Sequence, residues 1–321
     1  MNDPAIDVVA VSVRVPNHRE LVLQALSAGK HVYCEWPLGR DTAEAEEMRV
    51  AAASAGVHTV IGLQARANPA LRRASEMVAT RAIGRVLSAC LISETTAAFG
   101  PKTSEAYFYL EDPANGATQM TIHAGHAIDA VVAVLGGLVD VAVLASIQFP
   151  DVEVAGTVRT HRRTIPDHIF SQSRLQLGGV VSAELAAGRP NARFRFEVVG
   201  DRGSLLLEGG APSGFQSGRL TVSLNGVPHP IDDGELSQLP DTAFNVGAMY
   251  ARLRDDVATG VRTAPDFEHA VQLTNLIADM SRADETGTCI TAADRWPTST
   301  EAPTEREFPR AEDSARKGLC A

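Results

Sequence analysis

The stretch IDVVAVSVRVPN, residues 6–17, decides the fold. From Ile6 to Val13 it is a short apolar run rich in β-branched residues, which is the pattern of a strand covered on both faces in a parallel sheet. Pro16-Asn17 then turns the chain, and residues 20–28 have helical spacing of apolar positions and end at Gly29. Residues 31–35 are predicted to form the next strand.

The same alternation continues along the chain. Helices are predicted over 42–55 and 69–80, with a β-like segment at 59–63 between them. Strands that alternate with helices of this length form right-handed βαβ units. We therefore predict that residues 1–82 are part of a doubly wound α/β sheet, a partial Rossmann domain.

The pattern changes after Ile83-Gly84-Arg85. A longer strand is predicted at 86–94 and a longer helix at 116–135, followed by strand-like runs between glycine-rich turns and two late helices. The strand-like runs are 139–148, 168–177, 180–185, 194–199 and 204–208. Residues 83–290 are thus predicted to form an α+β domain with a mainly antiparallel open sheet. Residues 291–321 have the composition of a disordered tail.

Composition restricts the classes of function. The chain has 321 residues, a formal net charge of -10 and no sequence cluster of Lys and Arg, which disfavours nucleic acid as a partner. Its four cysteines are far apart and show no metal-ligand spacing, so no metal site is predicted. No signal peptide or long apolar segment is recognisable, and we expect a cytoplasmic protein without membrane contact.

Several motifs carry a resemblance to a known family. They occur in a consistent order along the chain: Pro16-Asn17, Gly29-Lys30-His31-Val32, Glu35-Trp36-Pro37, Gln64-Ala65-Arg66-Ala67-Asn68-Pro69, Ile83-Gly84-Arg85-Val86 and Gly125-His126-Ala127-Ile128-Asp129. The sequence resembles the Gfo/Idh/MocA family of NAD(P)-dependent oxidoreductases. Glu35-Trp36 and Thr164-Ile165-Pro166-Asp167-His168 are most similar to the branch that contains the fungal galactose-regulon repressor.

The resemblance implies NAD or NADP as cofactor, a sugar or polyol as substrate, and specific site residues. His126 is the expected catalytic residue and should face the crevice on the same side as Glu35 and Trp36. Substrate contacts are expected from Trp36, His123 and Asp129. Because strand ends face the ligand crevice in such sheets, the residues expected at the cofactor are Val13, Val15, Pro16, His18, Glu35, Trp36, Pro37, Gln64 and Arg66.

Three positions depart from the family's polar pattern. The lysine that usually takes the substrate proton is replaced by Trp36, whose indole only donates. Ile122 stands at the position of an aspartate, and Val15 at that of a threonine. Trp36 is expected either to stack on a ligand ring or to fill the space of the lysine.

The segment expected before the first strand in this family, with its glycine-rich turn for the pyrophosphate, has no counterpart in the sequence. We therefore expect Met1 to be an internal methionine or a misassigned start, and NAD(P) binding by the chain as given is in question. Three functions stay open: an oxidoreductase with an impaired motif, a dinucleotide-responsive regulator without catalysis, and a truncated inactive product. A homo-oligomer through the second-domain sheet is also expected.

Overall fold

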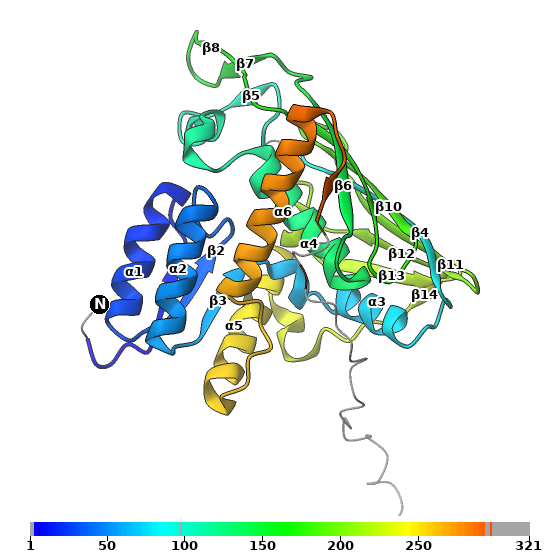
Figure 1. Cartoon of the computed structure of the whole chain (residues 1–321), viewed down its shortest axis with the longest axis horizontal. Helices are drawn as coiled ribbons and strands as arrows, with labels where there is room; N and C mark the ends of the chain where they lie inside the picture. Colours follow the sequence, from blue (N-terminus) through cyan, green and yellow to red (C-terminus); the bar gives the residue numbers. More distant parts are fainter. Residues whose placement is uncertain (1–2, 97, 293–295, 297–321) are drawn as a thin grey trace, which may run out of the picture.

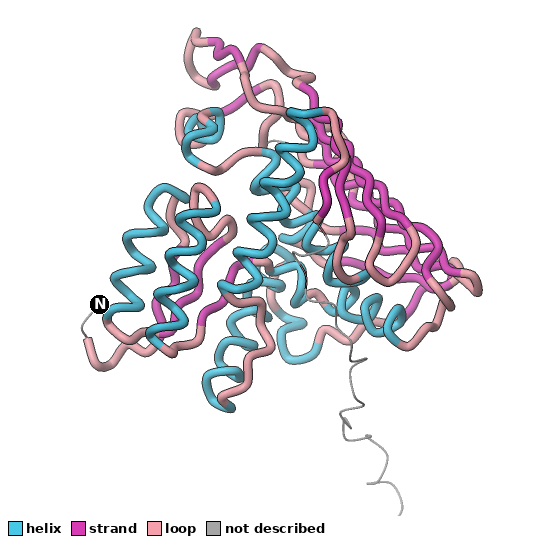
Figure 2. Tube along the Cα trace, in the orientation of Figure 1, coloured by secondary structure: helices cyan, strands magenta, loops and turns pink. Residues whose placement is uncertain are grey.

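The computed structural model describes residues 3–96, 98–292 and 296. Two sheets organise it: a small parallel sheet built by the first part of the chain, and a nine-stranded sheet built by the rest (Figure 1). Helices lie between the two sheets, as the tube view also shows (Figure 2). This arrangement confirms the predicted combination of a partial Rossmann sheet with a mainly antiparallel open sheet.

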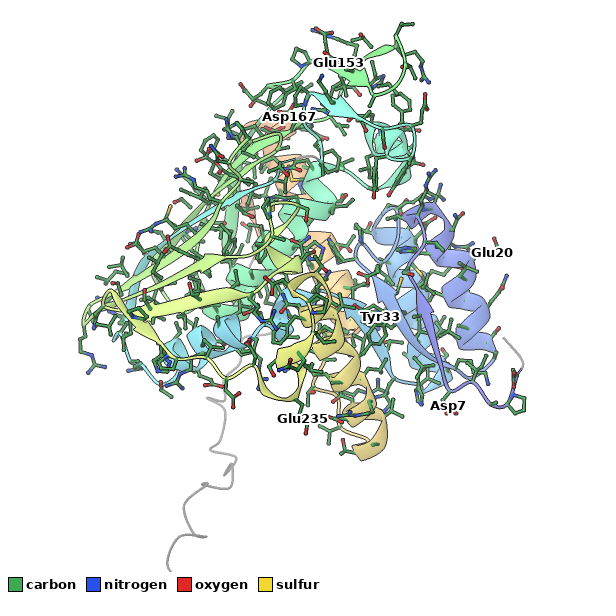
Figure 3. All side chains as sticks on the ribbon, turned by 180° about the vertical axis from the view of Figure 1, so that it is seen from behind. Asp7, Glu20, Tyr33, Glu153, Asp167 and Glu235 are labelled. Atoms are coloured by element: carbon green, nitrogen blue, oxygen red, sulfur yellow. The ribbon has the colours of Figure 1, made fainter. Side chains whose placement is uncertain are left out.

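The small sheet has the order β1-β2-β3, and all its strands are parallel. Its elements are β1 (Val8–Val11), α1 (His18–Ser27), β2 (His31–Glu35), α2 (Thr42–Ala55), β3 (Thr59–Gly62) and α3 (Pro69–Ala79). Tyr33 and Cys34 of β2 point to opposite faces, and both are fully buried. On one face Tyr33 stacks on Tyr250 of α5 (Asp241–Thr259), with ring centroids 4.6 Å apart, and Figure 3 labels Tyr33 beside this helix.

The large sheet has the order β14-β13-β12-β11-β4-β10-β9-β6-β15. Its strands in chain order are β4 (Val86–Glu94), β6 (Asp140–Ser146), β9 (His168–Arg174), β10 (Val180–Ala186), β11 (Phe194–Gly200), β12 (Ser204–Gly209), β13 (Leu220–Leu224), β14 (Val227–His229) and β15 (Ile290–Thr291). Of these pairs only β4 and β10 run parallel. Buried and exposed positions alternate along β9 and β10, so one face of the sheet is packed and the other is open.

Two helices join the sheets on the packed face. Helix α4 (Ala124–Leu135) is buried along almost its whole length, and α6 (Phe267–Thr286) packs against α2, β3 and β6. A single hydrophobic cluster consequently runs from Val32 of the small sheet to Phe196 of the large one. None of the helices in the described part of the chain is long and apolar enough to span a membrane.

Several sequence predictions need correction. The helix expected over 116–135 begins only at Ala124, and a π-helical turn, η5 (Gln119–His123), precedes it, because Thr118 caps the turn through a capping box with Thr121. Strands β13 and β14 were not expected, nor was a small sheet of β5 (Lys102–Thr103), β7 (Asp151–Val154) and β8 (Thr160–Arg162). These strands are short, so the alternation of apolar and polar residues along them is too brief to be recognised in the sequence. Apart from β15, Ala292 and Trp296, the predicted tail lies outside the described residues.

Candidate functional site

The candidate site lies where the end of β2 meets the start of α4. Trp36 is only 6% exposed, and its Nε1 donates a hydrogen bond to the Thr121 carbonyl oxygen over 2.8 Å. Its ring packs on Gly125, where an added Cβ would lie 2.7 Å from Trp36 Cε2. The indole is therefore fixed between β2 and α4, and of the two expectations for Trp36 this geometry favours the space-filling one.

The other two departures from the family's polar pattern are also packed together. Val15, after β1, is buried in a small apolar cluster, and Ile122 of η5 packs against that cluster. Nearby, the Arg14 guanidinium lies over the Tyr109 ring, 4.5 Å from its centroid. The first loop of the small sheet thus contacts the second part of the chain through apolar groups.

His126 lies beside Gly125 on α4, on the side of the large core. Its side chain is buried, and this burial lowers the pKa to about 4, with the Asp129 charge acting against the shift and His123 adding to it. Its Nδ1 is buried and has no hydrogen-bond partner among the described residues. Buried polar atoms are nearly always paired, so a neutral imidazole with an unpaired nitrogen is a candidate for contact with a ligand.

Two glutamines near α4 also have buried polar atoms without a hydrogen-bond partner among the described residues. Both amide atoms of Gln119 in η5 are buried without a partner in the described residues, and so is Oε1 of Gln64, which follows β3. The short helix that Gln64 opens contacts α4. Gln119 was not foreseen from the sequence, because a π-helical turn leaves no periodic signal. Amide groups of this kind fit a polar, uncharged ligand.

His123 was expected on one helical stripe with His126 and Asp129. His126 and Asp129 lie three residues apart on α4, whereas His123 ends the π-helical turn before it, and the three are close enough for the charges of Asp129 and His123 to act on the pKa of His126. The Nε2 of His123 lies 3.0 Å from the Ser93 carbonyl oxygen of β4, and burial lowers the pKa of His123 to about 4. His123 thus joins η5 to the large sheet, and its expected contact with a substrate stays a prediction.

Asp129 and Arg66 are also engaged elsewhere. The Arg66 guanidinium holds the Asp129 carboxylate through two bonds of 2.8 Å, and His269 Nε2 of α6 lies 2.6 Å from Asp129 Oδ1. Burial acts to raise the pKa of Asp129, but the Arg66 and His269 contacts outweigh it and bring the pKa to about 2. Asp129 is thus a buried ion-pair partner rather than a free substrate ligand. His269 was missed because it lies 140 residues from Asp129.

The remaining expected residues occupy the loops at the strand ends. His18 is buried, with Nε2 2.9 Å from the Val13 carbonyl oxygen and Nδ1 2.9 Å from that of Pro37, so its ring ties these loops together. Val13 is exposed. Pro16 turns the chain into α1.

Glu35 points to the α5 side with Tyr33, not to the side of Trp36. Its carboxylate oxygen lies against Gly62, and burial raises its pKa to about 7, with the Tyr33 hydroxyl acting against the shift. The expected common side of His126, Glu35 and Trp36 is therefore wrong for Glu35, while for Trp36 the structure shows a contact with Gly125, the residue before His126. Successive residues of a strand point to opposite faces, and this accounts for the separation.

Two family models match the chain. The model described as "Oxidoreductase family, NAD-binding Rossmann fold" matches residues 1–63, and the one described as "Gal80p, C-terminal domain" matches residues 69–209. Among curated proteins, dehydrogenase aclE of Aspergillus oryzae is 31% identical over 64% of this chain and 58% of its own length. The galactose/lactose metabolism regulatory protein GAL80 of Saccharomyces cerevisiae is 29% identical over 75% of this chain and 60% of its own length. The chain thus spans about three fifths of the length of these two relatives.

Solved structures share the fold. A super-repressor mutant of Gal80p from Saccharomyces cerevisiae superposes with a TM-score of 0.81 at 21% identity, covering 92% of this chain and 82% of that one. A levoglucosan dehydrogenase in complex with NADH and levoglucosan gives 0.77 at 19% identity, covering 90% and 81%. The chain thus resembles the NAD-binding Rossmann part of the oxidoreductase family over residues 1–63 and the Gal80p C-terminal domain over residues 69–209, and it shares its fold with these solved structures.

Proposed function

We propose that this chain carries the substrate side of an NAD(P)-dependent oxidoreductase site for a sugar or polyol, with His126 as the proton-handling residue. The observation that carries the proposal is the buried Nδ1 of His126, which lacks a partner among the described residues. A sugar hydroxyl offers both a donor and an acceptor, and it would satisfy this atom. The unpaired amide of Gln119 would serve a second hydroxyl.

The cofactor part of the proposal rests on the family and on Gln64. Its buried, unpaired Oε1 at the end of β3 fits a polar group such as the carboxamide of a nicotinamide. A nicotinamide held there would supply hydride transfer to or from a substrate carbon. The choice between NAD and NADP has no determinant among the described residues.

The residues of this chain limit the expected rate of the reaction. With a pKa of about 4, His126 is neutral near pH 7 and can accept a proton, but it is a weak base. Trp36 contributes no second proton acceptor, because its indole only donates and its Nε1 already bonds to the Thr121 carbonyl oxygen. We therefore expect slow turnover.

A second candidate is a dinucleotide-responsive regulator that does not catalyse. The observation in its favour is that Val15, Trp36 and Ile122 are all apolar and all packed, so three polar positions of the family's site are replaced in a mutually compatible way. The name of the GAL80 relative describes a regulatory protein. In this case ligand binding would persist without hydride transfer.

Turnover and binding measured side by side separate the two candidates. Wild type, His126→Ala and the control His161→Ala are assayed with NAD⁺ and NADP⁺ against levoglucosan, neutral hexoses and inositol, and binding is followed by calorimetry. The enzyme proposal predicts slow turnover that is lost only in His126→Ala. Dinucleotide binding without turnover in wild type would establish the regulator. Absence of both binding and turnover would reject both candidates.

We also propose that a second copy of the chain covers the open face of the large sheet. Leu144 and Phe170 face each other on adjacent strands there and are 70% and 46% exposed. Exposed apolar patches on a sheet face mark association surfaces. A dimer by light scattering that becomes monomeric in Leu144→Asp supports this, and a monomeric wild type refutes it.

A further inference from the structure

A second pocket lies beside the β3 edge of the parallel sheet. It has a volume of about 430 Å³ and is enclosed by α3, α5, the first turn of α6 and the loop before it. That loop runs along β3, where the Ile61 amide donates to the Pro265 carbonyl oxygen over 2.9 Å. Neither Trp36 nor His126 is among the residues that line this pocket.

Four arginines from four segments line this pocket. They are Arg66 after β3, Arg72 on α3, Arg252 on α5 and Arg262 in the loop before α6. Because they are far apart in the sequence, no cluster of basic residues was recognisable there. The fold brings them together in a protein whose formal net charge is -10.

The arginines are poorly neutralised. Arg66 is paired with Asp129, and Arg262 donates to the Val57 carbonyl oxygen over 3.0 Å. Arg72 and Arg252 make no side-chain hydrogen bond or ion pair with any described residue, although the chain is rich in carboxylates.

The two carboxylates that line the pocket are engaged with other groups. Glu76 is paired with Arg73 at 3.0 Å, and Asp266 caps α6 by accepting from the His269 amide over 3.1 Å. The pocket is therefore lined by more arginines than carboxylates, and neither of its two carboxylates pairs with Arg72 or Arg252.

The pKa of Arg252 reflects the repulsion between these neighbouring arginines. Burial lowers its pKa, the neighbouring Arg72 and Arg66 charges lower it further, and Asp256 acts against them. A bound anion would remove this repulsion, and guanidinium groups in a partly buried pocket bind phosphoryl oxygens through paired hydrogen bonds.

We propose that the pocket binds the phosphoryl group of a small phosphorylated metabolite. Its volume lies in the range of about 300–1,000 Å³ that is usual for small-molecule sites. The arginines form one concave cluster rather than a stripe along the surface, so a long polyanion is a poorer match. The site is separate from the proposed sugar crevice and does not depend on it.

The test uses inorganic pyrophosphate as the probe and calorimetry at low salt. Wild type should bind one equivalent, and Arg252→Gln should weaken binding by about tenfold or more, equivalent to about 1.4 kcal/mol. Arg72→Gln should do the same, so the result does not depend on one variant folding. The control is Arg254→Gln on the same helix, whose side chain is 70% exposed and held by Asp255. This control should bind like wild type.

Three outcomes would overturn the proposal. The first is that pyrophosphate gives no saturable binding to wild type. The second is that the Arg254→Gln control loses as much affinity as Arg252→Gln, which would indicate diffuse surface attraction. The third is that citrate binds with the same dependence on Arg252 while pyrophosphate does not, which would assign the pocket to carboxylates.

Discussion

Arg163 is the most completely engaged charged side chain described, and its replacement should be severely destabilising. Its side chain is fully buried, and it donates to both oxygens of Glu111 over 2.9 and 2.7 Å and to Asp167 over 3.0 Å. It also donates to the carbonyl oxygens of Phe99 and Gly100. Asp167, labelled in Figure 3, belongs to the motif that marks the galactose-repressor branch.

Arg163→Met would leave two carboxylates buried without a counter-charge, because Glu111 and Asp167 are 2% and 1% exposed. Breaking a buried ion pair by removing one partner costs about 3–5 kcal/mol. The free energy of unfolding in urea should fall by this amount, with the slope against denaturant unchanged.

The neighbouring residue provides a matched control. Arg162 is 71% exposed and pairs with Asp151, itself 63% exposed, so Arg162→Met should leave stability nearly unchanged. If Arg163→Met stayed within about 1 kcal/mol of wild type, the reasoning that buried carboxylates need this guanidinium would be refuted.

Two further predictions concern the crevice. Gly125→Ala should lower the unfolding free energy by about 1–3 kcal/mol through overpacking on Trp36, and Trp36→Phe in the same chain should restore part of it; equal stability of Gly125→Ala and wild type would contradict the packing. The pKa of His126 is lowered to about 4, against about 6.5 in the unfolded chain. Between these two values the unfolded state binds more protons than the folded state. The contribution of His126 to the free energy of unfolding is therefore complete above about pH 6.5 and is lost toward pH 4, by up to about 3 kcal/mol. His126→Gln should make this part of the pH profile shallower without removing it, because the pKa of buried His123 is lowered to about 4 as well, and an unchanged profile would show that His126 is not buried in its neutral form.

The sequence was most informative where a pattern is local and long. The helix predicted over 42–55 is present as α2, and the strand predicted over 6–13 is present as β1 over Val8–Val11. The prediction that this strand is covered on both faces is wrong, because only Val11 of β1 is buried. The π-helical turn before α4 could not be foreseen, since a single turn with wider hydrogen-bond spacing leaves no periodic signal in the sequence. The partners of Asp129 could not be foreseen either, because Arg66 and His269 reach it from other elements.

The same limit applies to the site. The replacement of lysine by Trp36 was evident from the motif, but its fixation by Thr121 and Gly125 depends on how two sheets are placed. The four arginines of the second pocket are separated by up to 196 residues, and only the fold shows their common orientation.

The most direct test of the central claim is hydride transfer itself. A polyol that carries deuterium on its oxidisable carbon is mixed with NAD⁺ or NADP⁺ and an excess of the protein, and deuterium in the reduced nicotinamide is measured by mass spectrometry. We expect slow transfer with wild type and none with His126→Ala. Equal transfer by both proteins would contradict the role assigned to His126, and no transfer by wild type would contradict the oxidoreductase proposal.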